Sequence, residues 1–234
     1  MNKRTILITG ATKGIGLATT EMLLERGYDV VGIARTDNAN YPGQFYKCDL
    51  SDAEQTKRLL AEIKHEHSID GVVNNVGLVM PELIEDVTLD NLHKVFDLNV
   101  RTAVQVVQMF LAGMKEQRWG RIVNITSRSM LGAKKRTSYS AAKAALAGCT
   151  RTWALELAEF GITSNAVAPG PIATELLYQA RPKGSADYHD MLDDMPVGRI
   201  GEPIEVAEAI AYLISENSGF ITGQTLHVDG GKSL

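Results

Sequence analysis

Short apolar runs rich in β-branched residues recur along the chain, separated by longer stretches with apolar residues at helical spacing. Unbroken runs of this kind are typical of strands buried on both faces, as in a parallel sheet. They predict seven strands. Six lie at residues 5–9, 29–34, 70–74, 121–126, 162–168 and 225–229, and the seventh, a short strand, ends at residues 46–50.

Helical spacing predicts helices at residues 17–26, 51–67, 89–114, 139–160 and 204–214. Strands and helices alternate from end to end without a repeat or a linker. We therefore expect residues 1–234 to form one α/β domain built on a parallel sheet. The polar segment 175–196 contains Pro182 and Gly184 and predicts a long loop or a helical lid.

Composition narrows the class of protein. Charged residues are 22% of the chain and the net charge is −4, which gives no sign of nucleic-acid binding. Cys48 and Cys149 are too few for a disulfide framework, so we expect a reducing, cytoplasmic compartment. No run of about 18 apolar residues suggests a membrane span. The apolar run behind the basic residues 1–4 stops at Thr9, so we expect no signal peptide.

A glycine-rich loop follows the first predicted strand, with Gly10, Gly14 and Gly16 in the spacing Gly-x-x-x-Gly-x-Gly. Glycines let the backbone approach a ligand closely, and the start of the next helix presents unpaired N–H groups to an anion. The loop therefore predicts a pyrophosphate-binding site of a dinucleotide, although its spacing differs from the common Gly-x-Gly-x-x-Gly. The alternative is a tight turn without a ligand.

Tyr139 and Lys143 are four residues apart in a stretch that favours helix, so both side chains should share one face. An ammonium beside the phenol would lower the pKa of Tyr139 and suit it to donate a proton near neutral pH. Ser127, at the end of a predicted strand, can bring a second hydroxyl to the same place. The alternative is a Ser-capped helix with an ordinary surface Tyr and Lys.

The sign of the charged residue that follows the second predicted strand indicates whether the dinucleotide is NAD(H) or NADP(H). An acidic residue there would pair with the ribose 2′-hydroxyl and repel a 2′-phosphate, but the strand is followed by Arg35. Arg35 can hold a phosphate by bidentate contacts, and Lys13 is a second candidate. Both cations could instead be solvated, and Asp37 could weaken the site. We expect NADP(H) rather than NAD(H).

Several motifs occur together, in order, along essentially the whole chain. They are Thr9-Gly10-x3-Gly14-Ile15-Gly16, Asp49, Asn74-Asn75-Val76-Gly77, Asn99, Ser127, Tyr139-x3-Lys143, Pro169-Gly170-x3-Thr174 and Val228-Asp229-Gly230-Gly231. The combination resembles the short-chain dehydrogenase/reductase family, which usually has Ala where this chain has Val76. Its pattern is most similar to the 3-oxoacyl-carrier-protein reductase branch. The resemblance implies a Rossmann-type, doubly wound parallel sheet with helices on both faces.

The resemblance also implies roles for single residues. Tyr139 would be the general acid or base, Ser127 would bind the substrate oxygen, and Asn99 would hold a water beside Lys143. Lys143 would also hold the nicotinamide ribose. The cofactor would contact Gly10, Thr12, Lys13, Gly14, Ile15, Gly16, Arg35, Asp49, Leu50, Asn75, Val76, Gly77, Tyr139, Lys143, Pro169, Gly170, Ile172 and Thr174. Among these, Asp49 and Leu50 would contact adenine, Asn75 the ribose, and Ile172 and Thr174 the carboxamide.

The expected reaction is the reversible, NADPH-dependent reduction of a ketone or 3-oxoacyl carbonyl. An acidic carrier protein would need basic residues near the site, and Arg118 is one, but Phe160 stands where the branch usually has a second. The basic run at residues 134–136 could attract an anionic substrate or could simply be solvated. A carbonyl reductase without a carrier, and a catalytically silent NADP-binding protein, are the alternatives. We expect a homotetramer, from the resemblance, and no metal site.

Overall fold

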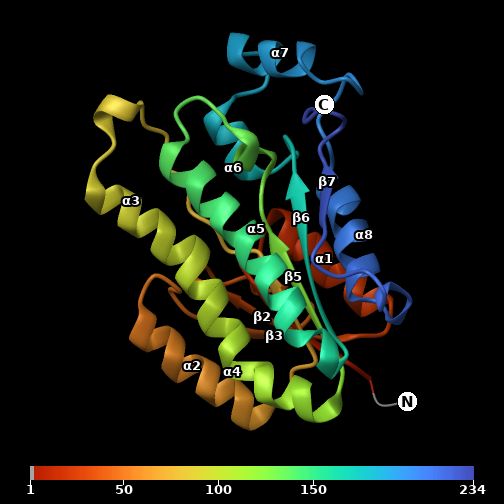
Figure 1. Cartoon of the computed structure of the whole chain (residues 1–234). Helices are drawn as coiled ribbons and strands as arrows, with labels where there is room; N and C mark the ends of the chain where they lie inside the picture. Colours follow the sequence, from red (N-terminus) through yellow and green to blue (C-terminus); the bar gives the residue numbers. More distant parts are fainter. Residues whose placement is uncertain (1–2) are drawn as a thin grey trace.

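A seven-stranded parallel sheet runs through the computed structural model, which describes residues 3–234 (Figure 1). Its strands are β1 (Thr5–Thr9), β2 (Asp29–Ala34), β3 (Gln44–Lys47), β4 (Gly71–Asn74), β5 (Gly120–Ile125), β6 (Ile162–Pro169) and β7 (Thr225–Val228). They lie in the order β3-β2-β1-β4-β5-β6-β7. All seven predicted strands are therefore confirmed. Residues 1 and 2, part of the segment considered for a signal peptide, lie outside the described residues.

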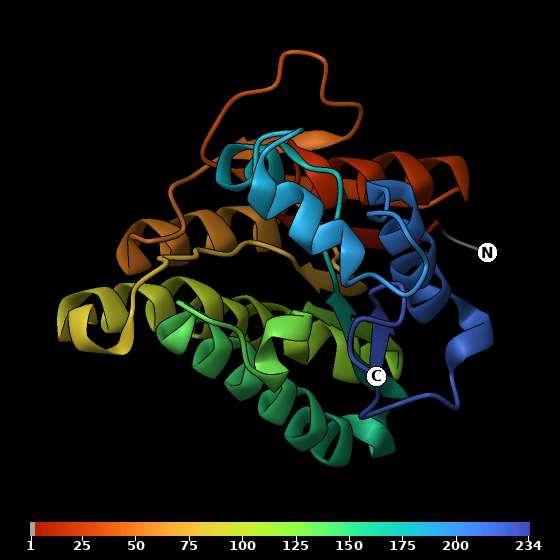
Figure 2. The ribbon, with the colours of Figure 1, turned by 90° about the horizontal axis from the view of Figure 1, so that it is seen from above.

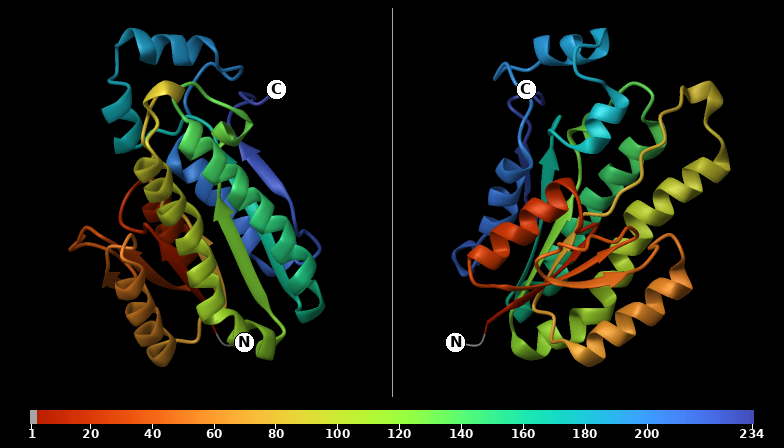
Figure 3. Two further views of the ribbon diagram at one scale, coloured as in Figure 1. Left: turned by 60° about the vertical axis from the view of Figure 1, so that its left-hand side comes forward. Right: turned by 180° about the vertical axis from the view of Figure 1, so that it is seen from behind.

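Helices cover both faces of the sheet (Figure 3). They are α1 (Gly14–Glu25), α2 (Ala53–Glu66), α3 (Leu89–Phe96), α4 (Thr102–Gln117), α5 (Thr137–Leu157), α6 (Glu175–Ala180), α7 (Ala186–Asp193) and α8 (Pro203–Ile214). On β1, Ile6 and Ile8 belong to the core under α1 and α8, whereas Leu7 belongs to the core under α2 and α4. Alternation along a strand buried on both faces explains the unbroken apolar runs. The doubly wound α/β fold is confirmed.

The helix predicted at residues 89–114 is not continuous. A turn of π-helix, Asp97–Arg101, separates α3 from α4. Asn99 lies in this turn and is 2% exposed. Its Nδ2 donates to the carbonyl oxygens of Val95 (2.8 Å) and Leu78 (2.9 Å), the second in the loop after β4. The prediction of one unbroken helix is wrong there, because a π-turn re-aims the asparagine toward that loop.

The predicted lid consists of α6, α7 and the connections around them. Both short helices lie beyond the carboxyl ends of the strands, on the side where α1 and α5 begin (Figures 1 and 2). Thr174 and Ser185 cap α6 and α7 by accepting hydrogen bonds from Leu177 N and Tyr188 N. The segment 175–196 thus contains two short helices, and its role as a substrate lid stays a prediction. Within residues 3–234, no helix has the length and apolar character needed to cross a membrane.

Candidate active site

The strand order reverses between β1 and β4, and in doubly wound sheets ligands bind at such a point, outside the carboxyl ends of the strands. Asn75 connects the carboxyl ends of β1 and β4 by hydrogen bonds. Its Nδ2 donates to the carbonyl oxygens of Thr9 and Gly10, both at 3.0 Å. The Thr9 hydroxyl accepts from the backbone N–H groups of Asn75 (3.0 Å) and Val76 (3.1 Å). Thr9 belongs to the motif that precedes the glycine loop, but no role was predicted for its side chain, which here joins the two strand ends.

The glycine loop has the close packing that a dinucleotide cradle requires. Gly10 and Gly14 have positive φ angles of 67° and 52°. A Cβ on Gly16 would lie 2.2 Å from the carbonyl oxygen of Gly10, so only glycine fits there. No side chain caps the start of α1, where the N-cap is Lys13. The first N–H groups of the helix therefore face the loop and suit a pyrophosphate.

The segment after β6 closes the other side of this loop. A Cβ on Gly14 would lie 3.0 Å from Cγ2 of Thr174, so the two segments touch. Gly170 packs equally closely, because its Cβ would lie 2.8 Å from Cα of Asp229. Ile172 is 6% exposed and pairs through its backbone with Gly201. The expected cofactor residues Pro169, Gly170, Ile172 and Thr174 thus belong to one continuous segment at the end of β6, and Thr174 brings this segment against the glycine loop.

Cationic side chains surround the expected adenosine end. Arg35 is exposed, and its charge contributes to lowering the pKa of Asp49, after the larger effect of hydrogen bonds from Ser51. Asp37, which could have weakened a phosphate site, forms an ion pair with Lys47. Lys13 instead pairs with Glu175 of the lid at 2.8 Å. Arg35 is thus the better placed of the two cations to hold a 2′-phosphate.

Leu50 and Thr12, two further residues expected to contact the cofactor, are both buried. Leu50 is 3% exposed, and its carbonyl oxygen accepts from Nη2 of Arg101 at 2.8 Å. It can therefore offer a ligand its backbone N–H but little of its side chain. Thr12 is 6% exposed, and its carbonyl oxygen accepts a 3.4 Å hydrogen bond from Asn38.

Tyr139 and Lys143 lie in the first two turns of α5, with Nζ of Lys143 5.6 Å from the centre of the Tyr139 ring. Lys143 is 2% exposed, and its Nζ donates to the carbonyl oxygen of Ile125 at 2.7 Å. Ser127 follows β5, and its hydroxyl is close enough to the Tyr139 hydroxyl to lower the pKa of that phenol. Oγ of Ser127 also accepts from Ser129 N at 3.1 Å. The three side chains predicted to act together are therefore brought together.

The pKa values differ from the expectation. Burial raises the pKa of Tyr139, and only Ser127 and the charge of Arg136 oppose it. Burial also lowers the pKa of Lys143 to about 8. The expectation that Lys143 would lower the pKa of Tyr139 is wrong for this structure. The reason is that both groups are removed from water, which disfavours the charged form of each.

Asn99 joins the same cluster through Gly77. A Cβ on Gly77 would lie 3.0 Å from Oδ1 of Asn99 and 3.4 Å from Nζ of Lys143, so both polar atoms face the same small space. The Asn99 oxygen is buried and accepts no hydrogen bond from the described residues. A buried acceptor of this kind calls for a donor such as water. Glycine at position 77 leaves the room for it.

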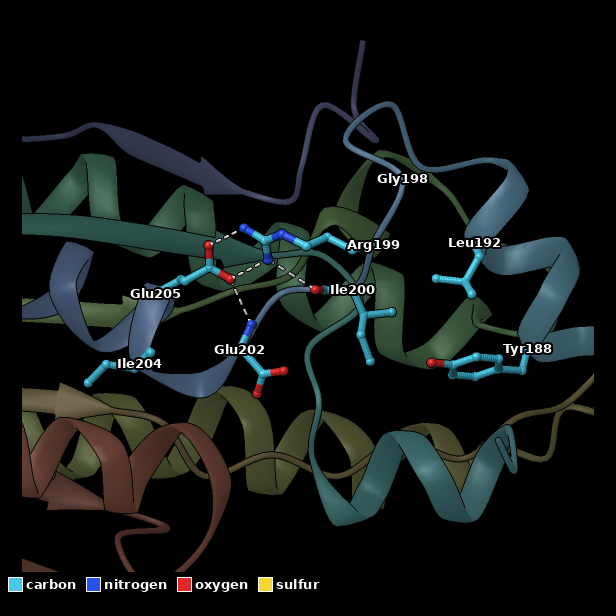
Figure 4. Close-up of a pocket in the computed structure, with 8 residues that line it drawn as sticks. All are labelled: Tyr188, Leu192, Gly198, Arg199, Ile200, Glu202, Ile204 and Glu205. Carbon is cyan, nitrogen blue, oxygen red and sulfur yellow. Dashed lines mark hydrogen bonds and ion pairs between the residues drawn. The ribbon is translucent and has the colours of Figure 1, made fainter. Parts of the chain in front are cut away.

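A cavity lies under the lid helix α7, and Tyr139 is not among the residues that line it (Figure 4). Its volume is about 520 Å³, and it separates α7 from the start of α8. Tyr188, Leu192 and Ile204 supply apolar surface, and an ion pair joins Arg199 to Glu205 at 2.7 Å. None of the residues expected to act chemically lines this cavity. Among residues 3–234 no cluster of His, Cys, Asp and Glu side chains could hold a metal ion.

Known proteins resemble this chain over nearly its full length. A family model described as enoyl-(acyl carrier protein) reductase matches residues 10–233. The 3-oxoacyl-(acyl-carrier-protein) reductase FabG of Vibrio harveyi is 36% identical over 238 residues, 97% of this chain and 96% of that protein. Ligand-free aldohexose dehydrogenase AldT of Thermoplasma acidophilum superposes with a TM-score of 0.91 at 30% identity, covering 99% of this chain and 94% of that one. ElxO with NADP bound gives 0.90 at 31% identity, covering 99% of each chain.

We predict that Gly16→Ala destabilises the protein and weakens dinucleotide binding. The added methyl would meet the backbone at 2.2 Å, so α1 must shift, at a cost of about 1–3 kcal/mol. Gly113→Ala in α4 is the matched control, because its Cβ meets nothing within 4 Å and alanine favours helix. Urea unfolding would measure the loss of stability, and calorimetric titration with the cofactor would measure the weaker binding. Equal stability of the two variants would contradict the packing described for Gly16.

A second prediction concerns Lys143 and pH. Its pKa is about 8 in the folded protein and about 10.4 in an unfolded chain. Between these values the unfolded chain holds a proton that the folded chain has lost, so stability rises with pH. Relative to Lys143→Met, the wild type should therefore gain about 3 kcal/mol from pH 8 to 10.5.

Unfolding by urea at several pH values would measure the Lys143 effect. Lys57→Met, at an exposed position of α2, controls for the loss of a surface charge. A constant difference between wild type and Lys143→Met across this range would show that the amine is not perturbed by burial.

Proposed function

Because the chain belongs to the short-chain dehydrogenase/reductase family, we propose that it is an NADPH-dependent oxidoreductase that reversibly reduces a ketone to an alcohol. The observation that carries the proposal is the meeting of Ser127, Tyr139, Lys143 and Asn99 beside the glycine loop. The four residues come from three parts of the chain: Ser127 follows β5, Asn99 lies in the π-turn, and Tyr139 and Lys143 lie in α5.

The proposed chemistry begins with the substrate oxygen held by the hydroxyls of Ser127 and Tyr139. When bound, the reduced nicotinamide supplies the hydride to the carbonyl carbon. Tyr139 gives its phenolic proton to the oxygen as negative charge develops there, and the Ser127 hydroxyl stabilises that charge. In the direction of alcohol oxidation, the same phenol takes the proton back.

Lys143 and Asn99 restore the proton on Tyr139 in this proposal. With a pKa near 8, Lys143 exchanges a proton easily close to neutral pH. The unpartnered oxygen of Asn99 and the amine of Lys143 face the same space at Gly77, which suits a water molecule that links the site to solvent. Asn99 is a positioning residue for that water, whereas Tyr139 and Ser127 are catalytic residues.

The preference for NADPH rests on Arg35. Its guanidinium is exposed near Asp49, and Asp37 is neutralised by Lys47. A 2′-phosphate can therefore accept bidentate hydrogen bonds from Arg35 without facing an unpaired carboxylate at position 37. That ElxO, a relative of similar fold, has been solved with NADP bound supports the same choice.

A 3-oxoacyl thioester is one substrate class within the proposal, because FabG of Vibrio harveyi is a relative. For carrier-protein docking, Arg118 is exposed but donates to the carbonyl oxygen of Glu159 at 2.7 Å. Phe160 supplies no second cation. A ketone that is not carried by a protein is therefore the alternative. A homotetramer and a cytoplasmic location stay predictions; the exposed side chains of Leu155 and Phe220 suit subunit contacts.

We predict that Tyr139→Phe lowers kcat for ketone-dependent NADPH oxidation about 10²- to 10⁴-fold, because the general acid is lost. NADPH binding should change little, since the ring remains in place. Stopped-flow absorbance at the NADPH band, with a panel of ketones, would measure the rate. Tyr178→Phe, in the lid helix α6, is the control for loss of a phenol elsewhere. Equal rates of Tyr139→Phe and wild type above background would refute the proposed function.

Arg35→Asp should weaken NADPH binding far more than NADH binding, because only NADPH carries the 2′-phosphate. Loss of a charged bidentate contact and gain of repulsion predict a change of about 100-fold or more in the ratio of the two dissociation constants. Fluorescence titration with each cofactor would give the ratio. Arg58→Asp, on the exposed side of α2, makes the same charge change at another place. An equal effect of Arg35→Asp on both cofactors would rule out its phosphate role.

A further inference from the structure

Three buried polar side chains form a chain of hydrogen bonds between the sheet and α5. Asn74 and Asn124 are register partners near the carboxyl ends of β4 and β5, and Nδ2 of Asn74 donates to Oδ1 of Asn124 at 2.8 Å. Nδ2 of Asn124 donates to Oγ1 of Thr150 in α5 at 2.9 Å. The Thr150 hydroxyl donates in turn to the carbonyl oxygen of Leu146 at 2.9 Å. We call Asn74, Asn124 and Thr150 the interior ladder.

The interior ladder has one arrangement of donors and acceptors. Asn74 is 4% exposed and the other two residues are 0% exposed, so their polar groups depend on one another. The one proton of the Thr150 hydroxyl goes to Leu146, so its oxygen can only accept from Asn124. Asn124 must therefore turn Oδ1 toward Asn74. At the far end, Oδ1 of Asn74 is buried without a partner among the described residues and calls for a donor such as water.

The face of α5 that packs on the sheet carries few large apolar side chains. The helix lies against β5 and β6 (Figure 3). Among its buried residues only Leu146 and Leu157 are large and apolar, and the others are small or polar. Small side chains make shallow ridges, which constrain a helix weakly along its axis. A hydrogen bond is lost once the two atoms move about 1 Å apart, so the bond from Asn124 to Thr150 sets the register of α5 on β5.

The register of α5 matters because the helix also carries Tyr139 and Lys143. Thr150 follows Lys143 by about two helical turns, so both residues project from the same side of α5. Asn124 directly precedes Ile125, whose carbonyl oxygen accepts from Nζ of Lys143 at 2.7 Å. Neighbouring residues of β5 thus hold α5 at two points. The long side chain of Lys143 is flexible, whereas the short side chains of the interior ladder are not.

We propose that Asn124 and Thr150 are positioning residues that, with Asn74, hold α5 in the register at which Tyr139 and Lys143 meet Ser127. The inference rests on the proposed function, because these residues act on the reaction only through the groups that α5 carries. A change in the interior ladder should therefore lower kcat more than it raises KM for the ketone.

Thr150→Val removes the hydroxyl at nearly constant volume and leaves Nδ2 of Asn124 unpaired. We expect kcat for ketone-dependent NADPH oxidation to fall about 10-fold or more, with KM for the ketone within a factor of about three. Thr150→Ser keeps the hydroxyl and should keep kcat within the same factor. Thr19→Val in α1 is the matched control: Thr19 is also 0% exposed and donates to the carbonyl oxygen four residues before it, at 2.7 Å, but pairs with no amide among the described residues.

A double-mutant cycle tests whether the ladder acts as one unit. Asn124→Leu should lower kcat by a factor similar to that of Thr150→Val. The double variant should lose no more than either single variant, because all three break the same connection between β5 and α5. If Thr150→Val does not fold, Asn124→Leu is compared with Thr150→Ser in its place.

The titration of Lys143 gives a readout that does not depend on turnover. NMR of protein with 13C-labelled lysines would follow it, and the Lys143 signal is the one missing from Lys143→Met. Burial lowers the pKa of Lys143 to about 8, so a displaced α5 that admits water should raise it. We expect a rise on the order of half a unit or more in Thr150→Val, and none in Thr150→Ser or Thr19→Val.

The outcomes separate the positioning role from the proposed function. If the wild type reduces ketones, equal kcat of Thr150→Val and Thr150→Ser, additive losses in the double variant, or an unshifted Lys143 titration in Thr150→Val would each overturn the positioning role and leave the proposed function intact. If the wild type reduces no ketone, the proposed function is refuted. The positioning of Lys143 then stands when its titration shifts in Thr150→Val alone, and falls when it does not.

Discussion

The burial of one amine organises the proposed active site. Lys143 is enclosed between the end of β5, which supplies the carbonyl oxygen of Ile125, and the loop at Gly77. Burying an ammonium is costly unless its protons find acceptors, and here it lowers the pKa of Lys143 to about 8. The position is fixed because β4 and β5 are neighbouring parallel strands whose exits meet at one edge. Any residue larger than glycine at position 77 would fill the space that Lys143 and Asn99 share.

The same edge of the sheet also sets the place of the proposed dinucleotide site. The loop after β1 can approach a pyrophosphate because Gly16 brings α1 against the backbone of Gly10. Asn75 then fixes the exit of β4 to that of β1 with two hydrogen bonds. In the proposed reduction, the hydride would come from the bound cofactor and the proton from Tyr139 at the start of α5. A rigid sheet with both exits tied together keeps their separation constant.

Much of this arrangement is accessible from the sequence. The strands could be predicted because burial on both faces makes their apolar runs continuous, and the site motifs lie at strand ends whose meeting follows from parallel topology. Asn99 could be recognised as unusual, but not the π-turn around it, since local spacing continues as helix on both sides. The sequence could also not predict that the pKa of Tyr139 is raised, because this shift depends on how deeply the start of α5 is buried.

The central claim is that Tyr139 donates the proton during carbonyl reduction. Its most direct test is the pH dependence of kcat for ketone reduction, measured in wild type and in the residual activity of Tyr139→Phe. The account predicts that the wild-type rate falls with rising pH, with a slope of about −1 in the logarithm once the donor has lost its proton. It predicts no such fall in Tyr139→Phe. The same descending limb in both proteins would show that another group supplies the proton.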